Sequence, residues 1–461
     1  MNKKIYNINQ VISIVGLLFL IIMYLYIMYI DRIKLFWGIM IIIIFLCAFF
    51  YSNKISLFML LATITMDKIS ITVSGFTITI GMVLIVLTYI KFIFNGKLFK
   101  VNYFKSRSFF TIVIAEFLLI ILLITSSLFA VDKMAAISKT FQFIFLIAVT
   151  ISIYIYCKIF NVKTILKYIL ISGFINLSLG IAQVIGYYLG VNVNSIFNIF
   201  KELNGVAYYG ISVVNISGII TPRMNGFFVD PAPFAGYMLT LGCAIFSLNL
   251  SRFSYKKIFL MFIYFIAIIL SFSRSSWLSL AIMFVSMMLF ININNKYKSA
   301  KINIIILSLL VVLIIIFREN LYFVFQRALQ TFQEGDISTE GHKNMAIYAI
   351  EAFKTRPIIG LGLNNFKDFV GFNTMTHSMY LTFLCETGIL GTIIYFYIWI
   401  YIIKRLYRNI KKYNCIESIA LFFILISILI CNITYDYYNQ LFIWIYIGLS
   451  IALIDKKEKV F

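Results

Sequence analysis

The sequence predicts an all-α, polytopic integral membrane protein with about 14 transmembrane helices and one large external loop. Of its 461 residues, 62% are hydrophobic and only 12% are charged, whereas a soluble chain is about half apolar and about a quarter charged. The excess apolar surface must therefore face lipid. Apolar stretches of about 20 residues, enough to cross a bilayer, recur along the chain, and Lys and Arg gather in alternate loops between them.

The apolar stretches predict the spans in chain order. They lie at 11–30, 35–51, 54–66, 71–94, 108–129, 137–158, 164–190, 233–250, 258–272, 275–291, 302–317, 378–403, 416–434 and 440–454. The first is too long for a cleaved signal and lacks a small-residue cleavage site, so we expect it to be retained. The third is the shortest. We expect one membrane domain over residues 1–461.

Positive charge predicts the orientation. An even number of spans places both termini on one side, and Lys and Arg favour cytoplasmic loops. With cytoplasmic termini, 25 of the 39 Lys and Arg residues lie inside. The net charge of +22 is then an orientation signal, with both termini in the cytoplasm, and it needs no nucleic-acid partner.

Two external segments, 191–232 and 318–377, contain both histidines and three of the four prolines, and the fourth, Pro233, directly follows the first segment. These residues are costly inside a spanning helix, so they indicate where irregular backbone is allowed. The second segment is the large external loop, in which we expect short amphipathic helices. Its residues 343–354 carry apolar side chains at helical spacing, namely Ala346, Ile347, Ile350 and Phe353. This spacing predicts an amphipathic helix along the membrane face.

Two arginines stand at outer ends of predicted spans. Arg223 belongs to a segment with three prolines and a glycine between 221 and 235, and its planar fork suits phosphate oxygens. A plain alternative is an arginine that snorkels to the interface. Arg274 lies among the hydroxyls of a tight turn, 271–277. It could equally cap a helix end, and Trp277 could be an interfacial anchor.

A third polar group begins at His377, where the large loop meets the twelfth span. A histidine near neutrality can take a proton from a hydroxyl, although most lone histidines are only satisfied by backbone or water. Glu386 lies about two and a half turns into the span and needs a partner or a proton. Arg274 is one candidate partner.

The orientation places Arg223, Arg274 and His377 at the same outer face. Two fixed cations and a base there suit a lipid-linked diphosphate that a sugar hydroxyl attacks. The cations would hold the leaving diphosphate, and the histidine would activate the acceptor. The chain has no Asp-x-Asp motif, and this chemistry requires no metal or other cofactor.

Four motifs in order resemble the O-antigen ligase and polymerase superfamily. Residues 223–235 resemble its R-x-x-G-x-F-x-x-P-x-x-F-A segment, and Ser273 to Trp277 resembles its S-R-S motif. Residues 357–366 resemble P-h-x-G-x-G-x-x-x-F, and 376–391 resemble H-N-x-Y-L…E-x-G-h-h-G. Order and spacing match from about 220 to 403, which we take as the motif-bearing catalytic region.

The resemblance implies an inverting, metal-independent, GT-C-like membrane glycosyltransferase that uses an undecaprenyl-diphosphate-linked glycan. Its catalytic residues would be Arg223, Arg274 and His377. The substrate-binding candidates are Arg223, Arg274, Lys343, Tyr380, Glu386 and Asp436. The chain departs from the family at Ser378, where Asn is common, and at Gly341-His342-Lys343, where Gly-Arg is common. Either Lys343 carries that cation or the contact is absent.

Asp436 is a candidate by its place in the external turn 435–440, although a solvated turn residue is the commoner case.

Several functions remain open. The leading one is a polymerase that joins repeat units into O-antigen or capsular polysaccharide, with a chain-length regulator protein as a partner. Next is a ligase that moves glycan from undecaprenyl diphosphate to lipid A core or protein. A transporter or flippase of lipid-linked sugar would show inverted repeats and mid-membrane charge, but no repeat is found and charge near mid-membrane is limited to Glu116 and Glu386. A binding or sensory membrane protein is also compatible.

Overall fold

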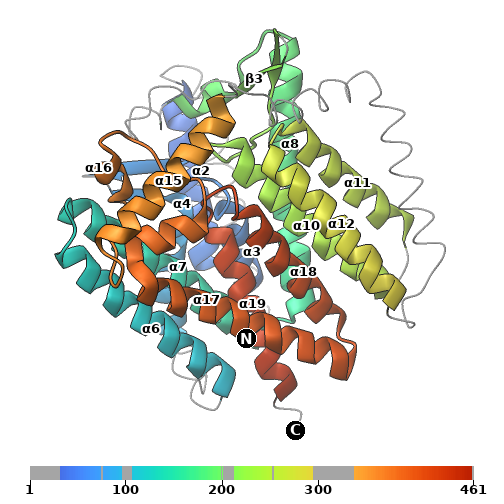
Figure 1. The fold of residues 1–461 in the computed structure, drawn as a ribbon. Helices are drawn as coiled ribbons and strands as arrows, with labels where there is room; N and C mark the ends of the chain where they lie inside the picture. Colours follow the sequence, from blue (N-terminus) through green and yellow to red (C-terminus); the bar gives the residue numbers. More distant parts are fainter. Residues whose placement is uncertain are drawn as a thin grey trace.

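The computed structural model describes residues 32–73, 76–95, 106–198, 200, 212–216, 218–251, 254–293 and 337–458. This part of the chain is a bundle of helices with two small hairpins (Figure 1). Its longer helices are α2 (Arg32–Phe50), α3 (Asn53–Thr63), α4 (Ile80–Phe94), α6 (Arg107–Leu128), α7 (Lys133–Ile159), α8 (Val162–Tyr188), α10 (Pro231–Ser251), α11 (Tyr255–Leu270), α12 (Arg274–Ile293), α15 (Ile337–Thr355), α17 (Met379–Tyr413), α18 (Ile416–Cys431) and α19 (Leu441–Glu458). Short helical segments are η2 (Val193–Phe197) and α16 (Phe366–Val370).

Five helices within the described residues are long and apolar enough to cross a membrane. They are Arg107–Leu128, Lys133–Ile159, Val162–Tyr188, Pro231–Leu248 and Met379–Tyr413. They confirm a polytopic, mainly helical membrane protein. The total of 14 spans stays a prediction, because the spans expected at 11–30 and 302–317 lie outside the described residues.

The predicted span 71–94 is wrong in its first third. Residues 70–79 form an antiparallel hairpin, β1 (Ser70–Val73) with β2 (Phe76–Thr79), and only α4 is helical. Alternating β-branched residues favour a strand, and the Thr72 and Thr77 hydroxyls pair across it at 3.1 Å. Thr79 then caps α4, since its hydroxyl accepts from the Met82 N–H at 3.3 Å. The predicted span 54–66 is likewise only the 11-residue α3.

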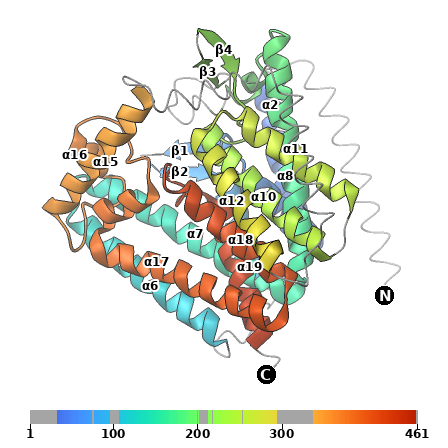
Figure 2. The same ribbon diagram turned by 45° about the vertical axis from the view of Figure 1, so that its right-hand side comes forward.

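A second hairpin corrects the all-α expectation further. Strands β3 (Val213–Ile216) and β4 (Ile219–Pro222) pair in antiparallel register within the external segment 191–232. The hairpin stands above the helices at one end of the bundle (Figure 2). Because β4 ends at Pro222, Arg223 lies directly at this end of the bundle.

The opposite end of the bundle carries many of the described basic residues. Lys158 at the end of α7 pairs with Asp455 near the end of α19. The Lys457 ammonium lies 5.5 Å from the ring centroid of Tyr413, the last residue of α17. The Tyr401 hydroxyl of α17 also donates to Ser108 Oγ at the start of α6, at 3.2 Å. Four helices therefore end together here, as the alternation of loop charges predicts.

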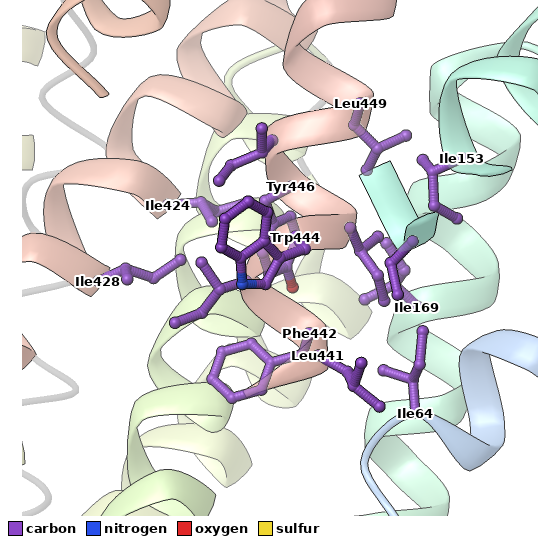
Figure 3. Close-up of a cluster of buried hydrophobic side chains, with 14 of the residues drawn as sticks. Ile64, Ile153, Ile169, Ile424, Ile428, Leu441, Phe442, Trp444, Tyr446 and Leu449 are labelled. Carbon is purple, nitrogen blue, oxygen red and sulfur yellow. The ribbon is translucent and has the colours of Figure 1, made fainter. Parts of the chain in front are cut away.

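Helix α19 is the buried centre of the bundle. Residues 441–455 are all buried, as expected for a helix that is covered by protein on every side. Figure 3 shows Trp444 and Tyr446 between side chains of neighbouring helices, including Ile424 of α18 and Ile153 of α7. This core fixes the helices whose polar residues lie at the hairpin end of the bundle, described below.

The amphipathic helix expected at 343–354 is present as part of α15, which packs on α17 (Figure 2). Its buried face differs from the expected one. Met345, Ala349 and Ala352 are buried, while Ile347 and Ile350 are 46% and 45% exposed. The small alanines let α15 lie close against its neighbours, which leaves the larger side chains outward.

Candidate functional site

A cavity of about 1000 Å³ opens at the hairpin end of the bundle. Five segments that are distant in the sequence contribute its walls, and we call it the cationic cavity. Its polar lining includes Arg223, Asp230, Arg274, His342, His377 and Tyr380. The three residues predicted to act together, Arg223, Arg274 and His377, therefore do meet in one cavity.

Arg223 joins two of the sequence motifs. Its backbone N–H donates to Ser212 O at 2.8 Å. Its Nε donates to Ser271 O at 2.8 Å and its Nη2 to Phe272 O at 3.4 Å. Burial lowers the pKa of Arg223, Asp230 opposes this, and the positive charge of Arg274 adds to it. The guanidinium is thus held by backbone carbonyls close to a second cation.

A buried lysine fixes the segment that follows Arg223. Lys68 is 1% exposed, and its ammonium donates to Gly226 O at 2.7 Å, Asn225 Oδ1 at 3.0 Å and Asn194 Oδ1 at 3.1 Å. These three acceptors match the three donors of an ammonium. Gln183 supports the same turn, because its Oε1 accepts from the Gly226 N–H at 2.9 Å.

Arg274 is the first residue of α12, after a strained turn. Phe272 has a φ of 50°, which is rare for a bulky residue. The hydroxyls of Ser273, Ser275 and Ser276 bond to one another at 3.0–3.1 Å. Trp277 donates from its indole to Ile268 O at 3.2 Å, so it locks α12 to the end of α11.

His377 also has a left-handed backbone, with a φ of 57°. The preceding Thr376 donates from its hydroxyl to Ser378 O at 2.9 Å, which stabilises the turn into α17. Burial lowers the pKa of His377, and Asp230 opposes this. A histidine that is neutral at pH 7 can accept a proton.

His342 of α15 is a site residue that our sequence analysis missed. Its ring centroid lies 4.6 Å from that of His377 in an edge-to-face arrangement. In contrast, Lys343 is exposed and lines neither cavity described here. The only sequence signal was that His342 is one of two histidines and occupies the place where the family has arginine.

The N-termini of three helices also lie at the cationic cavity. Its lining includes Asp230 and Ala232 at the start of α10, Arg274 and Ser275 at the start of α12, and Tyr380 near the start of α17. Each helix N-terminus carries partial positive charge, which favours anions. With the two arginines, these three helix ends make the cavity suited to a strongly anionic group.

A second, smaller cavity of about 160 Å³ adjoins the first, and the two share Thr376 and Tyr435. We call it the mixed-charge cavity, because Lys139 and Lys367 line it together with Glu386 and Asp436. It therefore contains Glu386 and Asp436, two of the predicted substrate-binding residues.

Partners for these two carboxylates differ from our expectations. Glu386 Oε1 accepts from the Phe366 N–H at 3.1 Å, and Glu386 and Arg274 line different cavities. Asp436 is not a solvated turn residue, since its Oδ2 accepts from the Thr382 hydroxyl at 2.6 Å. Tyr380 lines the cationic cavity, but its hydroxyl is already engaged by Leu429 O at 3.0 Å.

Glycines in two of the sequence motifs allow the loop 357–362 to pack closely against α17. At Gly388, φ is 65° and ψ is −171°, which breaks α17. The loop 357–362 fills the break. Its Leu361 and Gly362 N–H groups donate to Cys385 O and Glu386 O at 3.0 and 2.9 Å, and the Ile389 N–H donates back to Pro357 O at 2.8 Å. Irregular backbone at this depth is tolerated only where protein satisfies it.

The fold and the cavity define a polytopic membrane protein with an arginine-lined cavity at one end of its helical bundle. The family model described as O-antigen ligase matches residues 259–396. This match confirms the predicted resemblance to the O-antigen ligase and polymerase superfamily, whose members are membrane glycosyltransferase-like enzymes. It covers Arg274, His342, His377 and Glu386, and it leaves Arg223 and Asp436 outside. No curated protein matches the chain.

Proposed function

We propose that the protein is a polymerase that joins undecaprenyl-diphosphate-linked repeat units into O-antigen or capsular polysaccharide. The reaction would take place at the outer face of the bacterial cytoplasmic membrane, with both termini of the protein in the cytoplasm. The observation that carries the proposal is the cationic cavity, where two arginines, two histidines and three helix N-termini converge. The superfamily match supports a glycosyl transfer there.

In this proposal, Arg223 and Arg274 bind the diphosphate of the donor. A guanidinium offers paired N–H groups that fit phosphate oxygens, and the helix N-termini add partial positive charge. Arg223 is already held by the carbonyls of Ser271 and Phe272. Little reorganisation is then needed to stabilise the charge that grows on the leaving diphosphate.

His377 acts as the general base. Its neutral imidazole accepts the proton of an acceptor sugar hydroxyl, and the oxygen forms a bond to the anomeric carbon of the donor sugar. The bond from that carbon to the diphosphate oxygen breaks, and undecaprenyl diphosphate leaves with the electron pair. Attack from the opposite side inverts the anomeric centre. The Arg223 and Arg274 charges stabilise the product anion, and no cofactor takes part.

The ligase is the second candidate, because the matching family model is described as an O-antigen ligase. Both reactions use the same donor and the same cavity, and they differ only in the acceptor. The predicted total of 14 spans favours the polymerase by fold-level analogy.

Reconstitution separates the two. The purified protein is placed in lipid vesicles with radiolabelled undecaprenyl-diphosphate-linked repeat units, with or without lipid A core, and the products are resolved by size. A polymerase lengthens the lipid-linked glycan without another acceptor. Transfer to lipid A core alone would favour the ligase, and the absence of any transfer would contradict both.

Arg274→Lys tests the role of the arginine fork. The variant keeps the charge but loses the paired donors, so we expect its affinity for undecaprenyl diphosphate to fall at least about tenfold, by the strength of hydrogen bonds to charged groups. Arg107→Lys, at the distant start of α6, is the matched control. Wild-type affinity in Arg274→Lys would mean that the arginine supplies only charge.

A further inference from the structure

The mixed-charge cavity differs from the cationic cavity in what it can bind. Two lysines and two carboxylates line it, so their formal charges balance. Its remaining polar lining includes amides and hydroxyls, such as Asn364, Asn439 and Thr382. A diphosphate gains little from such a surface. A neutral molecule with many hydroxyl groups would find both donors and acceptors there.

One acceptor in this cavity has no hydrogen-bond partner among the described residues. Asp436 Oδ2 accepts from Thr382, whereas no described donor has hydrogen-bond geometry to the enclosed Asp436 Oδ1, although the Tyr438 N–H and the Lys139 ammonium lie near enough to favour the charged carboxylate. An enclosed carboxylate oxygen without a donor is costly. A ligand hydroxyl would supply the missing donor.

The cavity also has groups suited to the faces of a sugar ring. Phe366, Tyr435 and Tyr438 are among its lining residues, and the Lys139 ammonium lies 6.0 Å from the Tyr438 ring centroid. Aromatic rings beside a few fixed polar groups are common in small-molecule sites. Glu386 is fixed by the Phe366 N–H, so its position is set before any ligand arrives.

The position of the cavity relates it to the reaction. Thr376 lines both cavities and directly precedes His377. A glycan that runs from the cationic cavity into the mixed-charge cavity must therefore pass the proposed base.

We infer that the mixed-charge cavity binds one neutral sugar ring of a lipid-linked glycan, with Asp436 and Glu386 accepting from its hydroxyls. This inference rests on the proposed function, and it gives that function a subsite which selects the glycan. The ring belongs either to the donor or to the acceptor, and both present the same hydroxyl chemistry.

Binding to two lipids tests the inference. The full-length protein in nanodiscs is titrated with bare undecaprenyl diphosphate and with undecaprenyl-diphosphate-linked repeat unit extracted from the producing cells. We expect Asp436→Asn to weaken binding of the glycan-bearing lipid about tenfold, by the strength of hydrogen bonds to charged groups. Binding of the bare lipid should stay unchanged. Asp368→Asn, on the exposed surface of α16, is the matched control.

Asn439→Ala guards against loss of folding, because Asn439 is exposed and its side chain also lines the cavity. It should weaken glycan binding in the same selective way and leave the melting temperature unchanged. Equal losses for both lipids in Asp436→Asn, or no loss in either variant, would overturn the inference. Failure of the wild type to bind either lipid would overturn the proposed function, and the inference with it.

Transfer kinetics identify which glycan occupies the cavity. If the ring belongs to the donor, Asp436→Asn raises the KM for the donor and leaves that for a truncated acceptor unchanged. The acceptor KM rises instead if the ring belongs to the acceptor. A change in kcat alone, with both KM values preserved, would contradict a binding role.

Discussion

His377 is held in a conformation that few non-glycine residues adopt, beside a second histidine and near one carboxylate. Its φ of 57° carries strain, and such strain gathers where side-chain direction matters. The turn from Thr376 to Ser378 and the packing against His342 maintain it. The strained backbone of His377 therefore sets the direction of the side chain that lines the cavity.

The pH dependence of transfer follows from the His377 pKa, which burial lowers below the ordinary value of 6.5. The base works only when deprotonated, so the rate should be constant near pH 7 and above and fall as the pH drops through the lowered pKa. A pH–rate profile measures this. His377→Gln should lose about 10²–10⁴-fold in rate together with the acidic limb.

Asp436→Asn is the control for that limb, because burial raises the pKa of Asp436 to about 6 and the Thr382 hydrogen bond opposes this. A limb that persists in Asp436→Asn belongs to His377. If the limb vanishes there, the assignment to the histidine is wrong.

Lys68→Met tests the buried lysine. The change removes a donor from the oxygens of Asn194, Asn225 and Gly226. Gln183 Nε2 still donates to Asn194 Oδ1 and Gly226 O, so the main cost is the Asn225 oxygen, at about 1–3 kcal/mol for a buried group left unpaired. We expect a lower melting temperature and also a lower transfer rate, because the turn that follows Arg223 loses its anchor.

Lys91→Met is the matched control for Lys68→Met. Lys91 is also buried and also donates to carbonyls, those of Ala48 and Tyr51, but it is not part of the Arg223 turn. It should destabilise the protein without a specific loss of affinity for undecaprenyl diphosphate. Equal affinity losses in both variants would indicate a general effect of folding.

The break in α17 at Gly388 brings the glycine-containing loop 357–362 into direct contact with the helix. A Cβ on Gly388 would lie 2.3 Å from Ile358 O, and one on Gly360 would lie 2.3 Å from the Glu386 carbonyl carbon. Only glycines allow the loop 357–362 to approach the helix this closely. The same contact orients Glu386 and the first turns of α17, which carry the walls of both cavities.

Gly388→Ala should therefore be severely destabilising. Its backbone conformation, with φ 65° and ψ −171°, is adopted almost only by glycine and costs other residues about 1–3 kcal/mol, and the overlap with Ile358 adds to it. Thermal unfolding in detergent and transfer activity measure the effect. Gly371→Ala has the same kind of φ, 87°, but open space around it, so it should show the strain alone. Equal melting temperatures for the two variants would mean that the loop yields to the added methyl.

The whole bundle has two unlike ends: one holds the cavities, and the other gathers lysines and the Lys158–Asp455 pair. We predict that the cavity end faces outward. In a cysteine-free variant, Lys343→Cys should react with a membrane-impermeant maleimide in intact cells, and Lys412→Cys only after permeabilisation. Both positions are exposed. The opposite pattern would invert the orientation.

Much of this arrangement could be predicted from composition and motifs, and the failures have physical causes. Apolar length and loop charge predicted the helices and brought Arg223, Arg274 and His377 together. The hairpin 70–79 was missed because its strands are as apolar as a short piece of helix. Asp436 was undervalued because its hydrogen-bond partner, Thr382, is 54 residues away in the sequence. No sequence pattern around Lys139 indicates that it lines the same cavity as the carboxylates of Glu386 and Asp436.

The shared wall of the two cavities also bears on how the protein becomes active during its synthesis. A nascent chain that has emerged as far as Gly391 already contains all four motifs of the superfamily. It still lacks Tyr435, which lines both cavities, and Asp436. It also lacks α19, the buried centre of the bundle. The emerging protein would hold every motif of the proposed reaction and gain complete cavities only once α18 and α19 are inserted.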